Sequence, residues 1–337
     1  MTPSNGATRR ATIVGTGMYV PERVVPNSFF DDRYQRDIST FLRDHRNIHE
    51  RRWMAPDQCT SDLIVPAAEA AMKAAGVTAD QLDLIVVSTD TPDYLSPSTA
   101  SVVSYRLGAT RAGTFDINTA CAGFVTALDL ANKYIRADEH YQTILVVGAY
   151  AMSKWLNLDD YKIATLFADG AGAAVVRATT SGRGFSASHL WTDGQYHDYM
   201  GIYAGGSAMP LDAGVLARKD HLLAFPKRIP PETNGIHWPR IARIVLDRIG
   251  KQPGDVQHWF LTQFNVQSIH ETLDKLGVPR ERAHLVMDRF GYTGSASIGM
   301  CVADAVTAGK VQDGDLCVFI GSGGGMSMAA LALEWGD

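Results

Sequence analysis

Short apolar runs rich in β-branched residues recur along the whole chain, and stretches of helical periodicity separate them. The runs that we interpret as buried strands are 11–17, 82–89, 143–149, 172–178, 258–264 and 316–323. The stretches with helical spacing are 61–77, 124–137, 241–250 and 268–278. Strands that are apolar on both faces need cover on both faces, as in a sheet that lies between layers of helices. The sequence therefore predicts an α/β protein.

A weak internal repeat indicates that the chain has two similar halves. Residues 82–94 and 258–268 each follow a helix that ends in a turn. Each half then reaches a glycine-rich strand, at 170–176 in the first and at 321–333 in the second. Two α/β units packed on each other would produce this rhythm.

We place the boundary between the halves at the end of a glycine-rich strand. The first half is predicted over residues 1–178 and the second over 179–337. The stretch from about 180 to 235 is rich in Gly, Pro, His and Asp and has no clean periodicity. We therefore expect a loop-rich insertion there, which could shape a substrate channel.

Composition and charge exclude several classes of function. A net charge of −5 gives no basic surface of the kind that nucleic acid binding requires. No apolar run reaches the roughly 18 residues of a membrane span, and the first residues lack the pattern of a secretory signal. Four scattered cysteines form neither a disulfide framework nor a CxxC metal site. We expect a cytoplasmic enzyme without a bound metal.

Cys121 is the strongest candidate for chemistry. Strand-like residues 114–118 run into small residues, then into Cys121, and then into a long amphipathic helix. A thiol at a helix N-terminus is exposed to unpaired amides and to the helix dipole, which favour the reactive thiolate. The alternative is that Cys121 is a small core residue, as most lone cysteines are. The local context leaves both readings open.

Several motifs together resemble one known family. The sequence DINTACAGF around Cys121 and LFADGAGAAVV at 166–176 resemble β-ketoacyl-acyl-carrier-protein synthase III, of the thiolase superfamily. The likeness continues through 49–63, 288–299 and 321–335, so it spans nearly the whole chain in the right order. It implies the thiolase fold, in which two βαβαβαββ halves form a five-layer αβαβα sandwich, and usually a homodimer. It also implies that Cys121 carries an acyl group as a thioester.

The resemblance further implies an oxyanion hole. Glycines such as Gly323, Gly324 and Gly325 present bare backbone amides to a ligand, although three glycines alone can simply make a tight turn. In relatives of this type, one donor is the amide of the nucleophile and the other comes from this turn. We therefore expect the amides of Cys121 and Gly324 to serve as the donors.

The chain departs from the family where its condensing site normally has a His and an Asn. The family pattern HQAN matches residues 262–265, and we place Gln263 at the histidine position, with Asn265 two residues on. The pattern GNTSAAS matches the stretch from Gly291, which puts Tyr292 at the asparagine position. Gln and Tyr can donate hydrogen bonds but cannot act as a general base near neutral pH. We expect acyl transfer to be retained and decarboxylation of malonate to be altered or absent.

Donor recognition also differs from the family. Relatives clamp the adenine of coenzyme A between a Trp and an Arg and hold its phosphates with further Arg residues, and those cationic contacts are missing at the matching positions here. Ser96 stands where the partner subunit normally contributes a bulky residue to the acyl pocket, which indicates a longer or bulkier acyl group. The substrate-binding residues that we predict are Phe41, Ser96, Tyr161, Asn265 and Ser268. His270 is a candidate for a replacement base, but its spacing favours the surface of a helix.

These features predict an acyltransferase or ketosynthase of fatty-acid-like or polyketide metabolism. It would take an acyl group from a coenzyme A or carrier-protein thioester onto Cys121, with no cofactor, and pass the group to an acceptor. One alternative is conventional decarboxylating condensation with a malonyl thioester, with Gln263 and Tyr292 holding the carbonyl. The other is a non-catalytic subunit of a heteromeric synthase. A dehydrogenase is not supported, because residues 15–20 lack the GxGxxG pattern.

Overall fold

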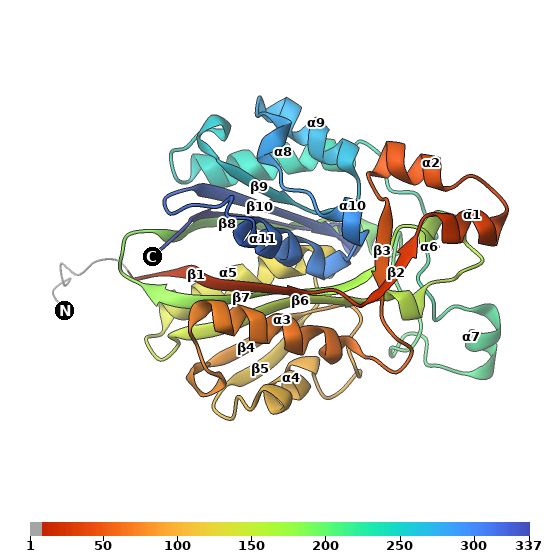
Figure 1. The fold of residues 1–337 in the computed structure, drawn as a ribbon, viewed down its shortest axis with the longest axis horizontal. Helices are drawn as coiled ribbons and strands as arrows, with labels where there is room; N and C mark the ends of the chain where they lie inside the picture. Colours follow the sequence, from red (N-terminus) through yellow and green to blue (C-terminus); the bar gives the residue numbers. More distant parts are fainter. Residues whose placement is uncertain (1–8) are drawn as a thin grey trace.

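The computed structural model describes residues 9–337, and its strands form two main sheets (Figure 1). The first sheet has, in spatial order, β1 (Arg10–Tyr19), β7 (Asp169–Thr179), β6 (Thr143–Ala151), β4 (Leu84–Ser88) and β5 (Gly113–Ile117). β7 runs antiparallel to both of its neighbours, β1 and β6, whereas β6, β4 and β5 are mutually parallel. Every residue of β6 is buried, which explains its continuous apolar sequence.

The second sheet is built from residues after 183. Its spatial order is β8 (Gly184–Thr192), β11 (Ser327–Glu334), β10 (Leu316–Gly323) and β9 (His258–Leu261). Next to β9, an isolated parallel bridge joins Trp259 to Ala283. This bridge occupies the position that the edge strand β5 has in the first sheet. β8 lies inside the stretch that we expected to be a loop-rich insertion, so that expectation was wrong for its first part. The alternating exposure of β8 gives it a weaker apolar signal than the buried strands have.

Helices cover both sheets and fill the space between them (Figure 1). α3 (Thr60–Ala75) and α4 (Thr99–Leu107) lie outside the first sheet, whereas α8 (Thr233–Asp247) and α9 (Val266–Leu276) lie outside the second. α5 (Gly123–Ala137) and α11 (Ser297–Thr307) lie between the sheets and contact both. In the first half the order is β1, α3, β4, α4, β5, α5, β6, β7. The predicted α/β class, the βαβαβαββ order and the five layers are confirmed.

Shorter elements surround this sandwich. A hairpin of β2 (Arg23–Pro26) and β3 (Glu50–Trp53) encloses the first short helices of the chain. The short helices are α1 (Ser28–Tyr34), α2 (Ser39–Phe41), α6 (Tyr161–Ala164), α7 (Ala213–Arg218), α10 (Met287–Phe290) and the π-helix η1 (Leu42–Arg46). The 3₁₀ turns are η2 (Ala79–Gln81), η3 (Ala120–Ala122), η4 (Met152–Trp155), η5 (Gly194–Tyr196), η6 (Pro253–Asp255), η7 (Arg280–Arg282), η8 (Gly294–Ala296) and η9 (Gly324–Met326). No helix within residues 9–337 has both the length and the apolar character for crossing a bilayer.

The helix expected at 241–250 begins earlier than predicted. α8 starts at Thr233 and continues through Pro239, a residue that normally ends or kinks a helix. Burial of Trp238, Ile241 and Val245 in the core between α8 and the second sheet outweighs the lost backbone hydrogen bond.

Gly15 and Gly17 of β1 let the strand lie directly against α3. A Cβ atom on Gly17 would stand 2.3 Å from the carbonyl oxygen of Ala67, and one on Gly15 would stand 2.4 Å from that of Ala71. Such distances are far inside van der Waals contact, so only glycine fits. The GxG sequence is therefore a packing feature of helix on strand, which agrees with the absence of a dinucleotide-binding pattern.

Replacing Gly17 with Ala should force β1 and α3 apart, because the new methyl group would clash with helix backbone. We expect the free energy of unfolding, measured by urea titration, to fall by about 1–3 kcal/mol. Gly113→Ala in β5 is the matched control, since its methyl group would meet nothing closer than Leu84 Cδ1 at 3.4 Å. Equal losses in the two variants would contradict this packing account.

Candidate active site

Cys121 lies where the chain turns from β5 into α5. β5 ends at Ile117, and Cys121 is the middle residue of η3, immediately before the first residue of α5. Ala120 has a φ of 46°, a left-handed conformation that costs energy for a residue with a Cβ atom. The side chain of Asn118 accepts a hydrogen bond from the Ala120 amide at 3.0 Å and supports this turn. The predicted position of Cys121 at a helix N-terminus is therefore present in the structure.

Three glycines allow neighbouring strands to approach this turn. A Cβ atom on Gly123 would lie 1.6 Å from Ser88 Oγ at the end of β4. A Cβ atom on Gly323 would lie 2.5 Å from the Cys121 amide nitrogen, and one on Gly321 would lie 2.8 Å from Ala122 Cα. The end of β10 thus packs against the nucleophile turn, and a side chain at any of these positions would push the groups apart.

A cavity of about 260 Å³ leads to Cys121 from the surface. Cys121 itself is 1% exposed and lies at the buried end. The lining comes from η1, from the loops before α8 and α9, and from the turn after β10. The lining residues are Arg46, Cys121, Met200, Phe225, Arg228, Ile229, Pro230, Pro231, Thr233, Asn234, Thr262, Phe264, Asn265, Ser268, Tyr292, Ser322, Gly323 and Met326. The part of 180–235 that follows β8 therefore contributes to a channel, as expected.

Tyr292 points into the site, and its hydroxyl donates a hydrogen bond to the Cys121 sulfur. Its backbone pairs with the segment from Leu166 to Ala168, with a nitrogen–oxygen distance of 3.0 Å to Leu166. Its ring packs against Phe167 and Phe264, at centroid distances of 5.5 and 5.0 Å. Burial raises the pKa of Tyr292 well above its usual value, so the hydroxyl remains a donor at neutral pH.

The glycine turn after β10 brings a backbone donor to the same sulfur. The Gly324 amide hydrogen-bonds to Cys121, and the amide of Cys121 itself also interacts with the sulfur. Gly325, with a φ of 70°, turns the chain so that η9 can follow. The two amides that we expected to form an oxyanion hole therefore both lie beside the Cys121 sulfur. Their role towards the oxygen of a thioester stays a prediction.

Gln263 does not belong to the cavity wall, and this part of our prediction was wrong. Its side-chain nitrogen donates to the carbonyl oxygens of Leu261 at 2.9 Å and His284 at 3.3 Å, and its oxygen accepts from the Val286 amide at 3.1 Å. Thr262, one residue earlier, lines the cavity instead. The chain turns at Gln263 and Phe264, directly after β9, so the first residue of the four-residue motif faces the site while Gln263 points into buried backbone.

The predicted substrate-binding residues fall into two groups. Asn265 and Ser268 line the cavity, although the Asn265 side chain also caps α9 by accepting from the Gln267 amide at 3.1 Å. Phe41 is 49% exposed and touches the cavity only through Arg46, whose guanidinium lies 5.6 Å from its ring centre. Tyr161 and Ser96 lie outside the lining. Arg36 covers the Tyr161 ring at 5.0 Å and donates to its hydroxyl at 2.9 Å.

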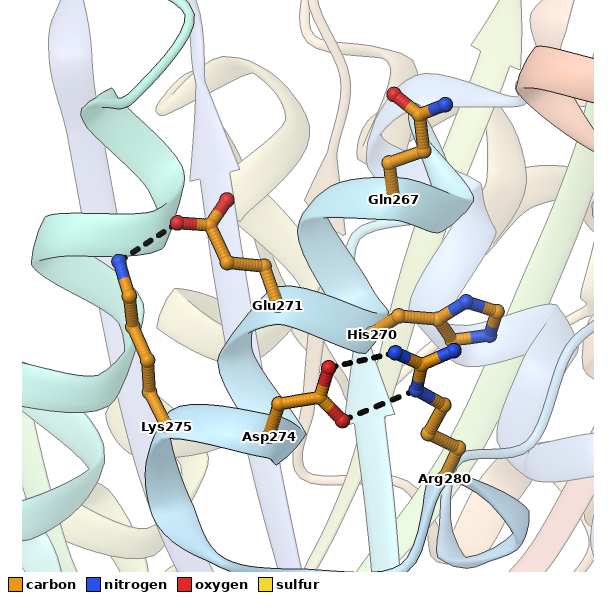
Figure 2. A pocket seen from close by; sticks show the side chains of 6 residues that line it. All are labelled: Gln267, His270, Glu271, Asp274, Lys275 and Arg280. Atoms are coloured by element: carbon orange, nitrogen blue, oxygen red, sulfur yellow. Dashed lines mark hydrogen bonds and ion pairs between the residues drawn. The ribbon is translucent and has the colours of Figure 1, made fainter.

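His270 lies in a separate, open pocket on the outer face of α9 (Figure 2). Figure 2 shows its ring beside Arg280, which pairs with Asp274 at 2.6 Å. His284 is buried, but its ring is bound by Asp304 at 2.7 Å and approached by Lys310 at 3.3 Å. Within residues 9–337, the cavity at Cys121 has no histidine in its wall. No imidazole therefore lies next to Cys121 in the described wall of this cavity.

Burial controls the ionisation of the nucleophile. Burial, together with the negative charge of Asp90, raises the pKa of the Cys121 thiol to about 12. Hydrogen bonds from Tyr292 and from the backbone amides of Cys121 and Gly324 act in the opposite direction but are weaker. The lowered pKa that we expected from the helix N-terminus is therefore contradicted. In the free protein the thiol is protonated at neutral pH.

Asp90 is a site residue that the sequence analysis missed. It follows β4, whose end pairs with β5 through the Thr89 amide and the Ile117 carbonyl at 3.2 Å. Its Oδ1 atom is buried with no hydrogen-bond partner among the described residues, and burial raises the pKa of Asp90 to about 6. The position after a buried strand was the only available signal, because carboxyl ends of parallel strands meet at one edge.

The reactivity of Cys121 towards iodoacetamide should therefore be low near pH 7 and rise without a plateau up to about pH 10. Asp90 ionises around pH 6 and then disfavours the thiolate, so the rise should be less steep there. Asp90→Asn should remove this inflection and increase the rate above about pH 7 several-fold. Peptide mass spectrometry, with Cys121→Ala as the blank, would measure these rates. A plateau near neutral pH would show instead that the thiolate is already formed.

Comparisons with known proteins agree with this geometry. Residues 115–194 match the family model of 3-oxoacyl-[acyl-carrier-protein] synthase III, and residues 246–335 match the model of its C-terminal part. The first match contains Cys121, and the second contains Tyr292 and the glycine turn around Gly324.

Individual relatives cover almost the entire chain. A β-ketoacyl-[acyl-carrier-protein] synthase III of Symbiobacterium thermophilum is 37% identical, over 97% of this chain and 99% of its own length. The acetoacetyl CoA synthase NphT7 of Streptomyces sp. strain CL190 is 38% identical, again over 97% and 99%. The crystal structure of 3-oxoacyl-[acyl-carrier-protein] synthase III from Aquifex aeolicus superposes with a TM-score of 0.86 at 28% identity, covering 96% of this chain and all of that one. The chain therefore belongs to the 3-oxoacyl-[acyl-carrier-protein] synthase III family of condensing enzymes.

Proposed function

We propose that the protein is an acyltransferase that forms a thioester on Cys121 and passes the acyl group to an acceptor without requiring decarboxylation. The observation that carries the proposal is the arrangement at the end of the cavity. There the Cys121 sulfur receives hydrogen bonds from the Tyr292 hydroxyl and the Gly324 amide. Donors of this kind stabilise both a developing thiolate and the negative oxygen of a tetrahedral intermediate.

The acylation step uses groups that are present. The Cys121 sulfur attacks the thioester carbonyl of the donor, a new carbon–sulfur bond forms, and the bond to the donor's sulfur breaks. The thiol proton of Cys121 leaves with the departing thiol of coenzyme A or phosphopantetheine, so no net charge is created. The amides of Cys121 and Gly324 would hold the carbonyl oxygen while it is negative. The donor is thus a substrate and no separate cofactor is needed.

The described cavity wall contains no imidazole, and this favours simple acyl transfer over conventional condensation. Decarboxylation of a malonyl thioester requires donors that hold its carbonyl as an enolate forms. Here Thr262 faces the cavity, but its hydroxyl donates to the Ser322 carbonyl oxygen at 3.5 Å and accepts from the Ser322 amide at 2.9 Å. Tyr292 is committed to the Cys121 sulfur. These contacts favour acyl transfer to a nucleophilic acceptor over release of carbon dioxide.

Conventional condensation remains a second candidate, because the similar acetoacetyl CoA synthase is named for a carbon–carbon bond-forming reaction. A non-catalytic subunit is the third. It is disfavoured by the open path to Cys121 and by the two donors directed at its sulfur.

The homodimer and the carrier-protein partner implied by the resemblance remain part of the proposal. The 83% exposed Leu95, beside Ser96, is a candidate contact for a second subunit.

Incubation with acyl thioesters on coenzyme A and on a carrier protein should increase the intact mass of the protein by one acyl group. Cys121→Ala should abolish the increase. Tyr292→Phe keeps the ring packing but removes the donor, and we expect it to slow acylation about 10- to 100-fold. Thr165→Val, which removes a hydroxyl outside the cavity wall, is the control and should acylate normally. No adduct with any donor would support the non-catalytic subunit instead.

An assay with malonyl thioesters distinguishes acyl transfer from decarboxylating condensation. If the proposal is correct, the adduct on Cys121 should keep the full malonyl mass, and no labelled carbon dioxide should be released from carboxyl-labelled donor. Release of label together with a 3-oxoacyl product would establish decarboxylating condensation. The measurement needs the wild-type protein, a second acyl donor and Cys121→Ala as the background.

A further inference from the structure

Asp90 is a carboxylate beside the nucleophile that the acylation step does not use. β4 lies between β5 and β6, and its last residue, Ser88, pairs with both of these strands (Figure 1). Two residues further along the chain, this register places Asp90 between the turn that carries Cys121 and the end of β6. The Thr91 hydroxyl accepts from the Ala151 amide at 2.9 Å, so the chain keeps this course beyond the strand.

The carboxylate of Asp90 is not satisfied by the protein. Its Oδ1 atom is buried with no hydrogen-bond partner in the described part of the chain, and its own backbone amide is the one donor there that stabilises its charge. Two other carboxylates of the first sheet differ. Asp169 accepts from the amides of Met54 and Ser153, both at 2.8 Å. Asp116 accepts from two amides at the start of α4, at 2.7 and 2.8 Å. Asp90 therefore lacks the structural role that its neighbours have.

The groups around Asp90 are uncharged at neutral pH. The Cys121 thiol and the hydroxyls of Tyr150 and Tyr292 all interact with its charge. Burial and this charge raise the pKa of Cys121 to about 12 and the pKa values of both tyrosines well above their usual value. Asp169 acts on the same group through Tyr150, but its oxygens accept from backbone amides. Among the described residues of this cluster, Asp90 alone is ionised and has an unpaired oxygen.

Asp90 lies near the Cys121 sulfur without contacting it. Its charge raises the pKa of the thiol, yet the hydrogen bonds to the sulfur come from Tyr292 and the amide of Gly324. Asp90 as a whole is only half-buried, so its side chain is not sealed in the core. A base at this position can act on atoms close to the sulfur rather than on the sulfur itself. A nucleophile that attacks an acyl carbon bonded to the sulfur carries its proton into that region.

Resting on the proposed function, we propose that Asp90 is the general base that activates a hydroxyl acceptor for attack on the acyl thioester of Cys121. A hydroxyl becomes a strong nucleophile only as it loses its proton, whereas a neutral amine or a carbanion attacks without a base. A hydroxyl also provides the donor that Oδ1 lacks. The negative charge of Asp90 disfavours a carboxylate beside the sulfur, which agrees with acyl transfer that does not use malonate.

The transfer step balances without a cofactor. The acceptor oxygen bonds to the acyl carbon while its proton passes to Asp90, and the carbon–sulfur bond then breaks. The sulfur leaves as a thiolate and takes the proton from Asp90, so the free thiol and the carboxylate are regenerated. Because Asp90 is protonated when the sulfur leaves, its charge no longer opposes the thiolate. Asp90, with a pKa of about 6, gives its proton readily to the thiolate of a thiol whose pKa is about 12.

Decay of the acyl-enzyme tests the role of Asp90. Cys121 is loaded with an acetyl group from a thioester, the donor is removed, and transfer to methanol is followed by peptide mass and by release of methyl acetate. The rate should rise with pH through about 6 and then level off, since Asp90 acts in its ionised form. Asp90→Asn should lower the plateau about 100-fold and remove the rise. Because Asp169 also has a pKa of about 6, a rise that persists in Asp90→Asn would belong to Asp169 and overturn the proposal.

The same variant distinguishes a base from a purely electrostatic effect. If Asp90 acts only through its charge, Asp90→Asn should speed both alkylation of the free thiol and transfer from the acyl form, because the thiolate becomes easier to form. A general base predicts opposite changes, with faster alkylation and slower transfer. Asp93→Asn is the control, because it removes a charge from the same loop but keeps an acceptor for the Ser61 amide, now at 2.9 Å. It should change neither rate, and faster transfer in Asp90→Asn would reject the base.

Thermal unfolding excludes a structural explanation of a slow variant. The pKa of Asp90 is raised in the folded protein, so its ionisation costs stability at every pH above its usual pKa. Asp90→Asn should therefore melt at or above the temperature of the wild type at pH 7. A lower melting temperature, together with slow transfer, would assign the carboxylate a structural role instead.

Loading with p-nitrophenyl acetate separates failure of this inference from failure of the proposed function, because this reagent acetylates a thiol without coenzyme A or a carrier protein. In a protein that no biological thioester acylates, transfer from acetyl-Cys121 that depends on Asp90 would sustain the base and reject the proposed donors. Acylation by those donors, followed by transfer that Asp90→Asn leaves unchanged, would do the reverse.

Discussion

The contact between the end of β10 and the turn that carries Cys121 determines where the other groups of the site lie. Gly321 and Gly323 have no side chains, so the strand backbone lies closer to Cys121 and Ala122 than any Cβ atom would allow. Cys121 belongs to the first half of the chain and β10 to the second, so the same contact joins the two halves. Gly324 follows directly, and its amide reaches the sulfur. The nucleophile and its anion-binding amide are therefore fixed by one piece of packing.

The burial of this site determines the protonation states of its groups. Burial makes the thiol and Tyr292 neutral, and it leaves Asp90 and Arg46 with buried polar atoms that the described residues do not pair. Unpaired buried groups reduce stability, and proteins retain them mainly where a ligand or a reaction uses them. Asp90 opposes formation of the thiolate, whereas Arg46 lines the cavity that leads to Cys121.

The sequence predicted the parts of the fold that depend on local apolar pattern. Central strands such as β6 were identified because all their residues are buried, whereas β8 was missed because its exposure alternates. At the site, the positions of Cys121 and Gly324 were inferred from motifs, but the direction of each side chain could not be read from the sequence. Thr262 and Gln263 were exchanged because the chain turns directly after β9, and the turn directs Thr262 to the cavity and Gln263 away from it. Arg46 and Asp90 lie far from Cys121 in the sequence, and only folding brings them near it.

The central claim is that one buried thiol, and not an accessible one, carries the acyl group. Cys59 provides the internal comparison, because it is partly exposed, whereas Cys121 is 1% exposed at the end of the cavity. The most direct test is tandem mass spectrometry of proteolytic peptides after brief exposure of the wild-type protein to an acyl thioester. The account predicts that the acyl group is found on the peptide containing Cys121 and is absent from that containing Cys59. Acylation of Cys59, or of neither cysteine, would contradict it.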